Sequence, residues 1–433
     1  MSHITNVLEF LDYIIWSYIG LLIMISSGIY FTIKSNFYQF RVLFNARKHI
    51  KEVLSLAKTK DDGIHPLKLY FTSVGGMVGL GNIVAVATTI TIGGPGSLIW
   101  LWIASMCGTL IKYSEIYLGI KYRVKTGRGS YDGGPMYFLK EAFKSRALPI
   151  ISCVLLCIYG AEIYQFTVLA DVIAGSFMVN KTLVVVLLII IVFFTALGGV
   201  KRVANICTTL MPFFMMSYVL VGLYIICLNY QVIPSILKSV LTSAFTGHGA
   251  VGGFAGSTLL YAMHYGVSRA VYSGDIGIGY DSIVNSETRL RNPETQSKIA
   301  IFSLFSDTMI CTISIMIILV TGVWKQDVSK VSDYMIMALS NYIPNAELFL
   351  SLLVFIAAFT TIVGYLAVGI KCAKYLSPRF GKIVYILYSI TVFFIFSSYD
   401  QNTALLVMSV SGGMLMMLNI SGVLKLRNVI EFK

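Results

Sequence analysis

Charged residues are scarce in this sequence. Of its 433 residues, 12% are charged and 57% are hydrophobic, and the mean hydropathy is +0.79. A soluble globular chain carries about 25% charged residues, so the composition excludes that class. The first 14 residues contain Glu9 and Asp12 but no Lys or Arg. A cleavable signal peptide begins with a basic region, so none is expected here.

Patterns for metal or covalent chemistry are also lacking. The sequence has no CxxC, no Cys/His pairing at metal spacing and no nucleophile elbow. The glycines of Gly79–Asn82 lie inside an apolar segment rather than after a soluble strand, which argues against a phosphate loop. We therefore expect no enzyme activity, no cofactor and no disulfide framework. The cysteines, expected to be buried free thiols in or beside apolar segments, are Cys107, Cys153, Cys157, Cys207, Cys227, Cys311 and Cys372.

What the sequence does have is long apolar segments. A run of about 20 apolar residues is long enough to cross a bilayer as a helix. Eleven such segments are found, at 12–33, 70–92, 97–120, 148–175, 182–199, 206–228, 252–285, 299–323, 347–369, 382–397 and 402–424. The sequence thus predicts an all-α polytopic membrane protein with eleven transmembrane helices, placed in the plasma membrane (the inner membrane of a bacterium).

The basic residues are distributed by side of the membrane. Of the 33 Lys and Arg, 27 fall in alternate loops and the C-terminal tail, four fall in the loops of the other side, and Lys112 and Arg269 lie within segments. Cytoplasmic loops carry the excess of Lys and Arg. The N-terminus is therefore predicted outside and the C-terminus inside. The formal net charge of +13 is attributed to this topology, and no nucleic-acid partner is expected.

One apolar stretch, Ser73–Ser97, is unusually rich in glycine. Gly75, Gly76, Gly79 and Gly81 fall within seven residues. Each weakens a helix by about 1 kcal/mol relative to alanine, so an unwound helix is predicted here. Non-helical backbone at membrane depth persists only where it is buried or lines a wet cavity. Close helix packing through small residues is the alternative explanation.

A second interrupted segment opens the other half of the chain. Tyr265–Ser282 is again rich in glycine. The two halves, 70–230 and 250–424, enter from opposite sides, so a five-plus-five inverted repeat with two broken helices is predicted. An extra helix and basic loop (1–69) precede it and a tail (425–433) follows. From a rise of about 1.5 Å per residue, the bilayer centre is predicted near Gly79–Gly81 and near Met263–Gly266.

Several motifs resemble those of the sodium:alanine (amino acid carrier) symporter family. They are Gly79-Leu80-Gly81-Asn82, Gly93-Gly94-Pro95-Gly96, Lys112 with Glu115, Gly133-Gly134-Pro135-Met136-Tyr137-Phe138, Pro293 with Gln296, Asp307-Thr308 and Phe359-Thr360-Thr361-Ile362. The resemblance covers about residues 65–400. It implies the inverted-repeat fold of the bacterial leucine transporter, and sodium-coupled uptake of an amino acid. The chain departs from the family pattern at Leu80, Ala85, Tyr365 and Ser273–Gly277, which bears on the substrate more than on the fold.

A transport site is expected between the two interruptions. The amides of Leu80 and Gly81, beside Gly79, are predicted to bind the substrate carboxylate at a helix N-terminus. The carbonyls of Tyr265 and Gly266 are predicted to face the ammonium group. Gln165 matches a substrate-contacting position of the family, with an interhelical hydrogen bond as the alternative. Thr361 and Tyr365, one helical turn apart, are expected to line the substrate pocket.

By resemblance, a sodium ion is held by backbone carbonyls and threonine hydroxyls. The implied ligands are the carbonyls of Gly75, Val78 and Ala357 and the hydroxyls of Thr360 and Thr361. Hydrogen bonds of the threonines to their own helix are the alternative. Asn82 is either a further cation ligand or a brace for the interruption.

Charged side chains within apolar segments are functional candidates. Ser273 and Asp275 are predicted to belong to a cytoplasmic gate, together with Arg269 and Asp307. Asp307 is expected to interact with Arg269 or Asp275. Lys112 and Glu115 are spaced to pair on one helix face. Glu162 has no obvious local partner, and His264 is expected to be packed.

The sequence as a whole predicts a monomeric symporter that carries sodium and a small neutral amino acid, alanine or glycine, into the cell. Proton coupling, or another small amino acid, is the main alternative. A channel is disfavoured because it would need rings of like groups.

The charge distribution leads to a test of topology. Single cysteines placed in a cysteine-free version at the loops after 228 and after 323 should react with an impermeant thiol reagent from outside. Cysteines in the loops 34–69 and 121–147 should not react. The measurement is labelling of intact cells, and labelling of the 34–69 loop would contradict the predicted orientation.

Overall fold

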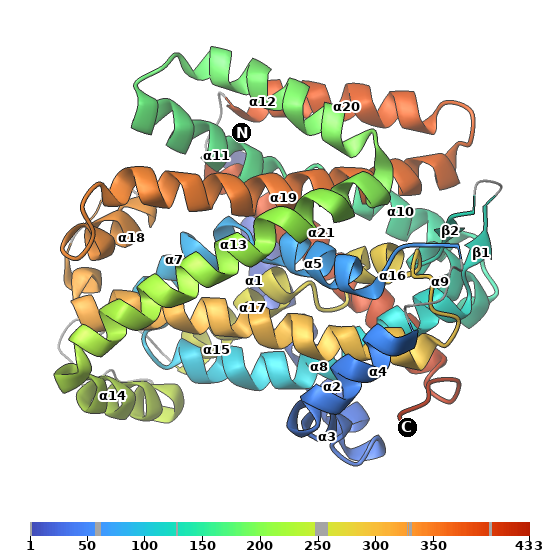
Figure 1. Ribbon diagram of the computed structural model, residues 1–433, viewed down its shortest axis with the longest axis horizontal. Coiled ribbons are helices and arrows are strands. Elements are labelled where there is room, and N and C mark those ends of the chain that lie inside the picture. The colour runs from blue at the N-terminus through green and yellow to red at the C-terminus, as the bar shows by residue number, and fades with distance from the viewer. Residues whose placement is uncertain are drawn as a thin grey trace.

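A computed structural model describes residues 2–56, 62–126, 129–246, 259–326, 328, 331–397 and 401–433, and it is nearly all helical (Figure 1). The long helices largely coincide with the predicted apolar segments, although the first helical stretch begins at Ser2 and not near residue 12. They are α1 (Ser2–Ile14), η1 (Ile15–Ile19), α2 (Gly20–Lys34), α8 (Ser97–Lys121), α10 (Ala147–Tyr159), α11 (Ile163–Phe177), α12 (Lys181–Ala196), α13 (Gly199–Leu228), α17 (Pro293–Thr321), α19 (Ala346–Leu376), α20 (Gly381–Ser397) and α21 (Gln401–Lys425). In the described part of the chain, six helical stretches are long and apolar enough to cross a membrane. The count of eleven stays a prediction.

The first predicted interruption is present. The stretch divides into α5 (Pro66–Met77), α6 (Leu80–Ile83) and α7 (Val86–Gly93). Val78 and Gly79 leave the helical conformation, with φ/ψ of −80°/89° and −117°/−157°. The side chain of Asn82 accepts a hydrogen bond from the Gly79 amide (3.2 Å) and so caps the start of α6. The glycine-rich sequence therefore located this break correctly.

The second interruption lies further along the chain than predicted. Helix α15 runs without a break over Leu259–Gly274, and α16 begins at Tyr280 and ends at Asn285. Between them the chain turns through left-handed residues, at Asp275 (φ 52°), Gly277 (φ 76°) and Gly279 (φ 107°). Met263–Gly266, predicted to lie at the bilayer centre, therefore falls within continuous helix and not at the break. The depth estimate assumed entry near Gly253, which lies outside the described residues, whereas the 16 residues of α15 alone rise about 24 Å.

The shorter elements lie in the connections. The basic loop after the first segment contains two helices, α3 (Tyr38–Phe44) and α4 (Ala46–Leu56). The glycine-rich loop after α8 forms a two-stranded antiparallel hairpin, which the sequence did not indicate. The strands of the hairpin are β1 (Val124–Lys125) and β2 (Tyr131–Asp132). The remaining short helices are α9 (Pro135–Phe143), η2 (Tyr230–Val232), α14 (Ile233–Thr246), η3 (Val323–Lys325) and α18 (Val331–Ser340).

Helix α8 holds the two broken helices together. It packs against α15, α16 and α17, while α5 packs against α13, α17 and α19. Lys112 of α8 is completely buried, and its ammonium forms an ion pair with the Asp281 carboxylate (Nζ–Oδ2 2.6 Å). It also contacts the carbonyl of Gly274 and the sulfur of Met77 (2.7 Å). The predicted pairing of Lys112 with Glu115 is therefore wrong, because an acceptor from a distant helix occupies the ammonium.

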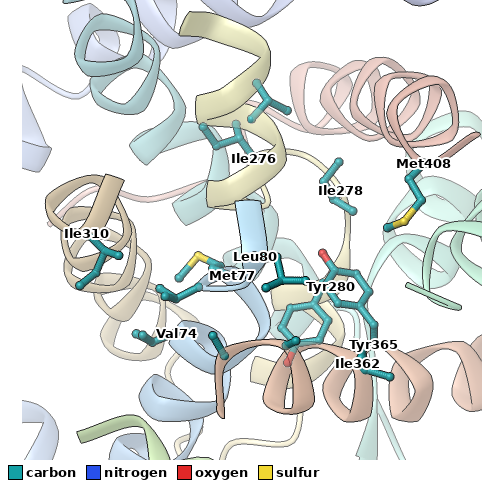
Figure 2. Packing of buried hydrophobic residues seen from close by; sticks show 14 of the residues in the cluster. Val74, Met77, Leu80, Ile276, Ile278, Tyr280, Ile310, Ile362, Tyr365 and Met408 are labelled. Atoms are coloured by element: carbon teal, nitrogen blue, oxygen red, sulfur yellow. The ribbon is translucent and has the colours of Figure 1, made fainter. Parts of the chain in front are cut away.

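Tyr280, at the start of α16, fills the space between α5 and α19. Its hydroxyl donates to the carbonyl of Thr72 (3.1 Å), and its ring stacks on the ring of Tyr365 with centroids 4.4 Å apart (Figure 2). A Cβ at Gly76 would lie 2.3 Å from the ring, and a Cβ at Gly364 would lie 2.5 Å from the hydroxyl. Glycine at these positions therefore permits the close approach of three helices. The seven cysteines are free thiols, although Cys227 is exposed rather than buried.

This packing predicts the effect of adding one methyl group. Gly76→Ala should lower the stability of the purified protein by about 1–3 kcal/mol, the usual range for overpacking, because the new Cβ meets the Tyr280 ring. Gly175→Ala is the matched control, since a Cβ there meets nothing within 4 Å. Thermal unfolding in detergent measures both. Equal unfolding temperatures for the two variants would contradict the role of Tyr280.

Candidate transport site

A small cavity lies between the two interruptions. It is lined by Gly81 and Asn82 from the first break, Ser273 and Asp275 from the second, and Thr361 and Tyr365 from α19. Its free volume is about 10 Å³, which is roughly the space that one water needs. The structure is therefore closed around this point, and a larger ligand can enter only after the surrounding helices move.

The oxygens of the predicted sodium site come together beside the cavity. The Thr361 hydroxyl reaches across from α19 to the carbonyl of Gly75 on α5 (3.0 Å), and it also contacts the carbonyl of Ala357 (3.0 Å). The Thr360 hydroxyl contacts the same Ala357 carbonyl (3.0 Å) and that of Ile356 (2.9 Å). Four of the five predicted groups thus share one location. Among the described residues, the hydrogen bonds of the Thr360 hydroxyl go to its own helix and to the sulfur of Met211 (3.5 Å).

The fifth group, Val78, marks the point where α5 ends. Its ψ of 89° takes the carbonyl out of the helical hydrogen-bond pattern, which requires ψ near −42°. A carbonyl released in this way can coordinate a cation. The local geometry is therefore compatible with the predicted role of Val78.

Gln165 reaches the first interruption from α11. Its side-chain oxygen accepts a hydrogen bond from the Leu80 amide (2.8 Å). A Cβ at Gly79 would lie 2.3 Å from Gln165 Nε2, so glycine is needed where the carboxamide packs. The amide that was predicted to bind a carboxylate is thus satisfied by Gln165 in this closed structure. A substrate carboxylate can reach it only if Gln165 moves.

Asn82 and Asp307 form a buried polar connection between the two breaks. Asn82 Nδ2 donates to Asp307 Oδ1 (2.6 Å), and the Ser273 hydroxyl donates to Asp307 Oδ2 (3.0 Å). Asn82 also caps α6 through its oxygen, so its contacts are those of a brace. The expected interaction of Asp307 with Arg269 and Asp275 is electrostatic, whereas among the described residues the hydrogen bonds of its carboxylate go to Asn82 and Ser273. Helix α17 turns Asp307 toward Asn82 and Ser273, and Arg269 donates to the Ala85 carbonyl instead (2.9 Å).

The residues predicted to bind the ammonium lie elsewhere. Tyr265 lines a separate, larger vestibule of about 550 Å³ that also contains Glu9, Asp12 and Arg269. Gly266 packs on α8, where a Cβ would lie 2.5 Å from the carbonyl of Ser97. Because α15 is continuous at this point, these carbonyls remain in the helix and do not face the cavity.

The predicted gate residues separate into two places. Ser273 and Asp275 line the cavity itself, because the second break lies further along the chain than predicted, and their role in a gate stays a prediction. Arg269 lines the vestibule near the N-terminal helix. On the charge-based topology that vestibule belongs to the outer face, which disagrees with the cytoplasmic position predicted for Arg269. Tyr272 lines both the vestibule and the cavity and so separates them.

Sequence reasoning missed three aromatic or acidic contributors to the cavity. Glu162, Tyr159 and Tyr272 all line it. Glu162 sits at the break between α10 and α11 with φ of 51°, a conformation that L-residues adopt rarely. Its signal was visible as a carboxylate inside an apolar segment, and Gly160 lies in this third break, but one glycine is a weaker signal than the four within seven residues that marked the first.

Comparison with known proteins identifies a family and a fold. The model of a family described as the sodium:alanine symporter family matches residues 1–432. An uncharacterized transporter of Haemophilus influenzae is 29% identical over 440 residues, covering 99% of this chain and 94% of that protein. The sodium/alanine symporter AgcS of Methanococcus maripaludis is 28% identical, covering 86% of this chain and 83% of the relative.

Solved structures show the fold. The crystal structure of MhsT in complex with L-phenylalanine superimposes with a TM-score of 0.55 at 15% identity, covering 83% of this chain and 90% of that one. The likeness is to transporters of the leucine-transporter fold, not to enzymes. Relatives carry names that specify alanine or glutamine, and sodium or proton coupling, which indicates an amino acid symporter. The chain belongs to the sodium:alanine symporter family.

Proposed function

We propose that this protein carries a small neutral amino acid, alanine or glycine, into the cell together with Na⁺ by alternating access. The observation that carries the proposal is the meeting of the Thr361 hydroxyl with the carbonyls of Gly75 and Ala357. These oxygens come from α5 and α19, so an ion bound among them connects the broken helix to the helix opposite it. Oxygen ligands suit a hard cation such as Na⁺.

The closed cavity supports a substrate that binds beside the ion. It borders the proposed ion site directly, because Thr361 belongs to both, and Tyr365 covers it one helical turn further along α19. The Tyr365 hydroxyl donates to Asp275 Oδ1, which ties α19 to the second interruption. Binding of the ion would therefore favour the geometry in which both breaks face one pocket, and this is a direct physical basis for coupling.

Uptake into proteoliposomes tests the proposal. Labelled alanine and glycine should accumulate when Na⁺ is present outside, and replacement of Na⁺ by K⁺ should abolish accumulation. Accumulation driven by a proton gradient without Na⁺ would instead support proton coupling. We further propose a monomer in the plasma membrane with its N-terminus outside, which agrees with the distribution of Lys and Arg.

The ion site leads to a prediction about sodium affinity. Thr361→Val, which keeps the shape but removes the hydroxyl, should raise the Na⁺ concentration for half-maximal uptake about tenfold or more, because contacts to charged groups are worth about 1.5–3 kcal/mol. The double variant with Thr360→Val should show a larger rise. Thr109→Val is the matched control, since in the described part of the chain that hydroxyl bonds the Ser105 carbonyl of its own helix (2.8 Å). Unchanged sodium activation in the double variant would contradict the site.

The pocket leads to a prediction about substrate size. Tyr365→Ala should admit larger neutral amino acids and weaken the binding of alanine, because the removed ring leaves a cavity. Tyr365→Trp should favour alanine and glycine, and Tyr365→Phe should keep the size preference. One methylene is worth only about 1–3 kcal/mol in an apolar pocket, so the change should be graded. Competition by a series from glycine to leucine measures it, and an unaltered rank order in the Ala and Trp variants would place Tyr365 outside the pocket.

A further inference from the structure

The cavity contains two buried carboxylates with incomplete hydrogen bonding. Glu162 and Asp275 both line it, and their side chains are 2% and 1% exposed. In the part of the chain that the structure describes, oxygen Oε2 of Glu162 and oxygen Oδ2 of Asp275 have no hydrogen-bond partner. Each residue has a left-handed backbone conformation, with φ of 51° and 52°, and each follows the end of a helix. Three helix interruptions therefore meet at one cavity, and two of them present a carboxylate to it.

The side chains that line the cavity provide no positive charge to balance this pair. The lining contains no Lys, Arg or His among the described residues. Lys112 acts electrostatically on Asp275, but its ammonium is bound to Asp281 at 2.6 Å. Arg269 donates to the Ala85 carbonyl and to the Thr89 hydroxyl (3.2 Å). Buried charges are normally paired, because removing an unpaired carboxylate from water is very costly.

A cationic group on the ligand would satisfy both oxygens. An ammonium group has three N–H donors and one positive charge, so it can donate one hydrogen bond to each of two carboxylates and a third to another oxygen. The amide of Leu80, by contrast, is satisfied by Gln165, so the closed structure offers more to the positive end of an amino acid than to its carboxylate.

We infer that Glu162 and Asp275 form the ammonium-binding subsite of the transport cavity, so that the substrate class is set by a protonated primary amine and only secondarily by a carboxylate. The inference rests on the proposed function, since it describes the same cavity. The inference assigns the binding of the ammonium group to two side-chain carboxylates. The carbonyls of Tyr265 and Gly266, which were predicted to bind it, do not line the cavity. Small amines without a carboxylate should therefore bind.

Ligand binding to the full-length protein in detergent tests this inference without any mutation. In Na⁺ buffer, ethylamine and alaninamide should raise the unfolding temperature in a saturable way, as alanine does. Propionate, which lacks the amine, should not. Tetramethylammonium chloride at equal ionic strength, which has a charge but no N–H donor, should also have no effect. Stabilisation by propionate and not by ethylamine would overturn the inference.

Variants locate the effect. Glu162→Gln and Asp275→Asn should each raise the dissociation constant of ethylamine about 10- to 100-fold, the range for a lost charge-assisted hydrogen bond. Asp171→Asn is the matched control on the same helix as the cavity-lining Gln165. Its carboxylate pairs with Lys181 (2.6 Å) and lies outside the cavity, so it should leave the constant unchanged.

The failures of the two proposals are distinguishable. If sodium-dependent alanine uptake is present but both acidic variants bind ethylamine as the wild type does, the subsite is refuted and symport stands. If no amino acid is transported but the variants lose ethylamine binding, the subsite is supported and the symport proposal fails. If the variants lose affinity for Na⁺, titrated without amines, while ethylamine binding is unchanged, the pair is a second cation site and the inference is overturned.

Discussion

The ammonium group of Lys112 contacts the ends of three helical pieces that border the two interruptions. It pairs with Asp281 of α16, contacts the last carbonyl of α15 at Gly274, and lies against Met77 at the end of α5. Removing one partner from a buried ion pair typically costs about 3–5 kcal/mol, because an uncompensated charge remains. The position of both breaks relative to each other therefore depends on one charge on α8, and so does the cavity between them.

Around this contact, small residues and large rings complement each other. Glycine at 76 and 364 leaves room for Tyr280, whose ring supports Tyr365, whose hydroxyl in turn contacts Asp275. The sequence of contacts runs from α5 through α16 to α19 and back to the second break. Closely packed protein interiors move between discrete arrangements rather than deforming gradually. A closed cavity with room for about one water is one such arrangement, and a transport cycle requires others.

Backbone chemistry was easier to predict than side-chain partners. The break at Val78 and Gly79 followed from four glycines in seven residues, and the threonines of α19 were correctly expected to lie opposite it. The second break was misplaced because its position was counted from the start of the segment 252–285. That start is not marked in the sequence, since glycine and apolar residues continue on both sides of it. Lys112 was assigned to Glu115 because only neighbours on one helix can be recognised from spacing, and Asp281 is far away in the chain.

By itself, the sequence determined the class of the protein, the helical segments, the presence of two interrupted helices and the family resemblance. These features depend on hydrophobicity, glycine content and local motifs, which are properties of contiguous residues. Only the tertiary structure decided that Glu162, Asp275 and Tyr272 share a cavity, that Gln165 occupies the Leu80 amide, and that Arg269 faces a different vestibule. These relations depend on the rotation of each helix about its axis. That rotation is fixed by packing against distant parts of the chain, so no local pattern records it.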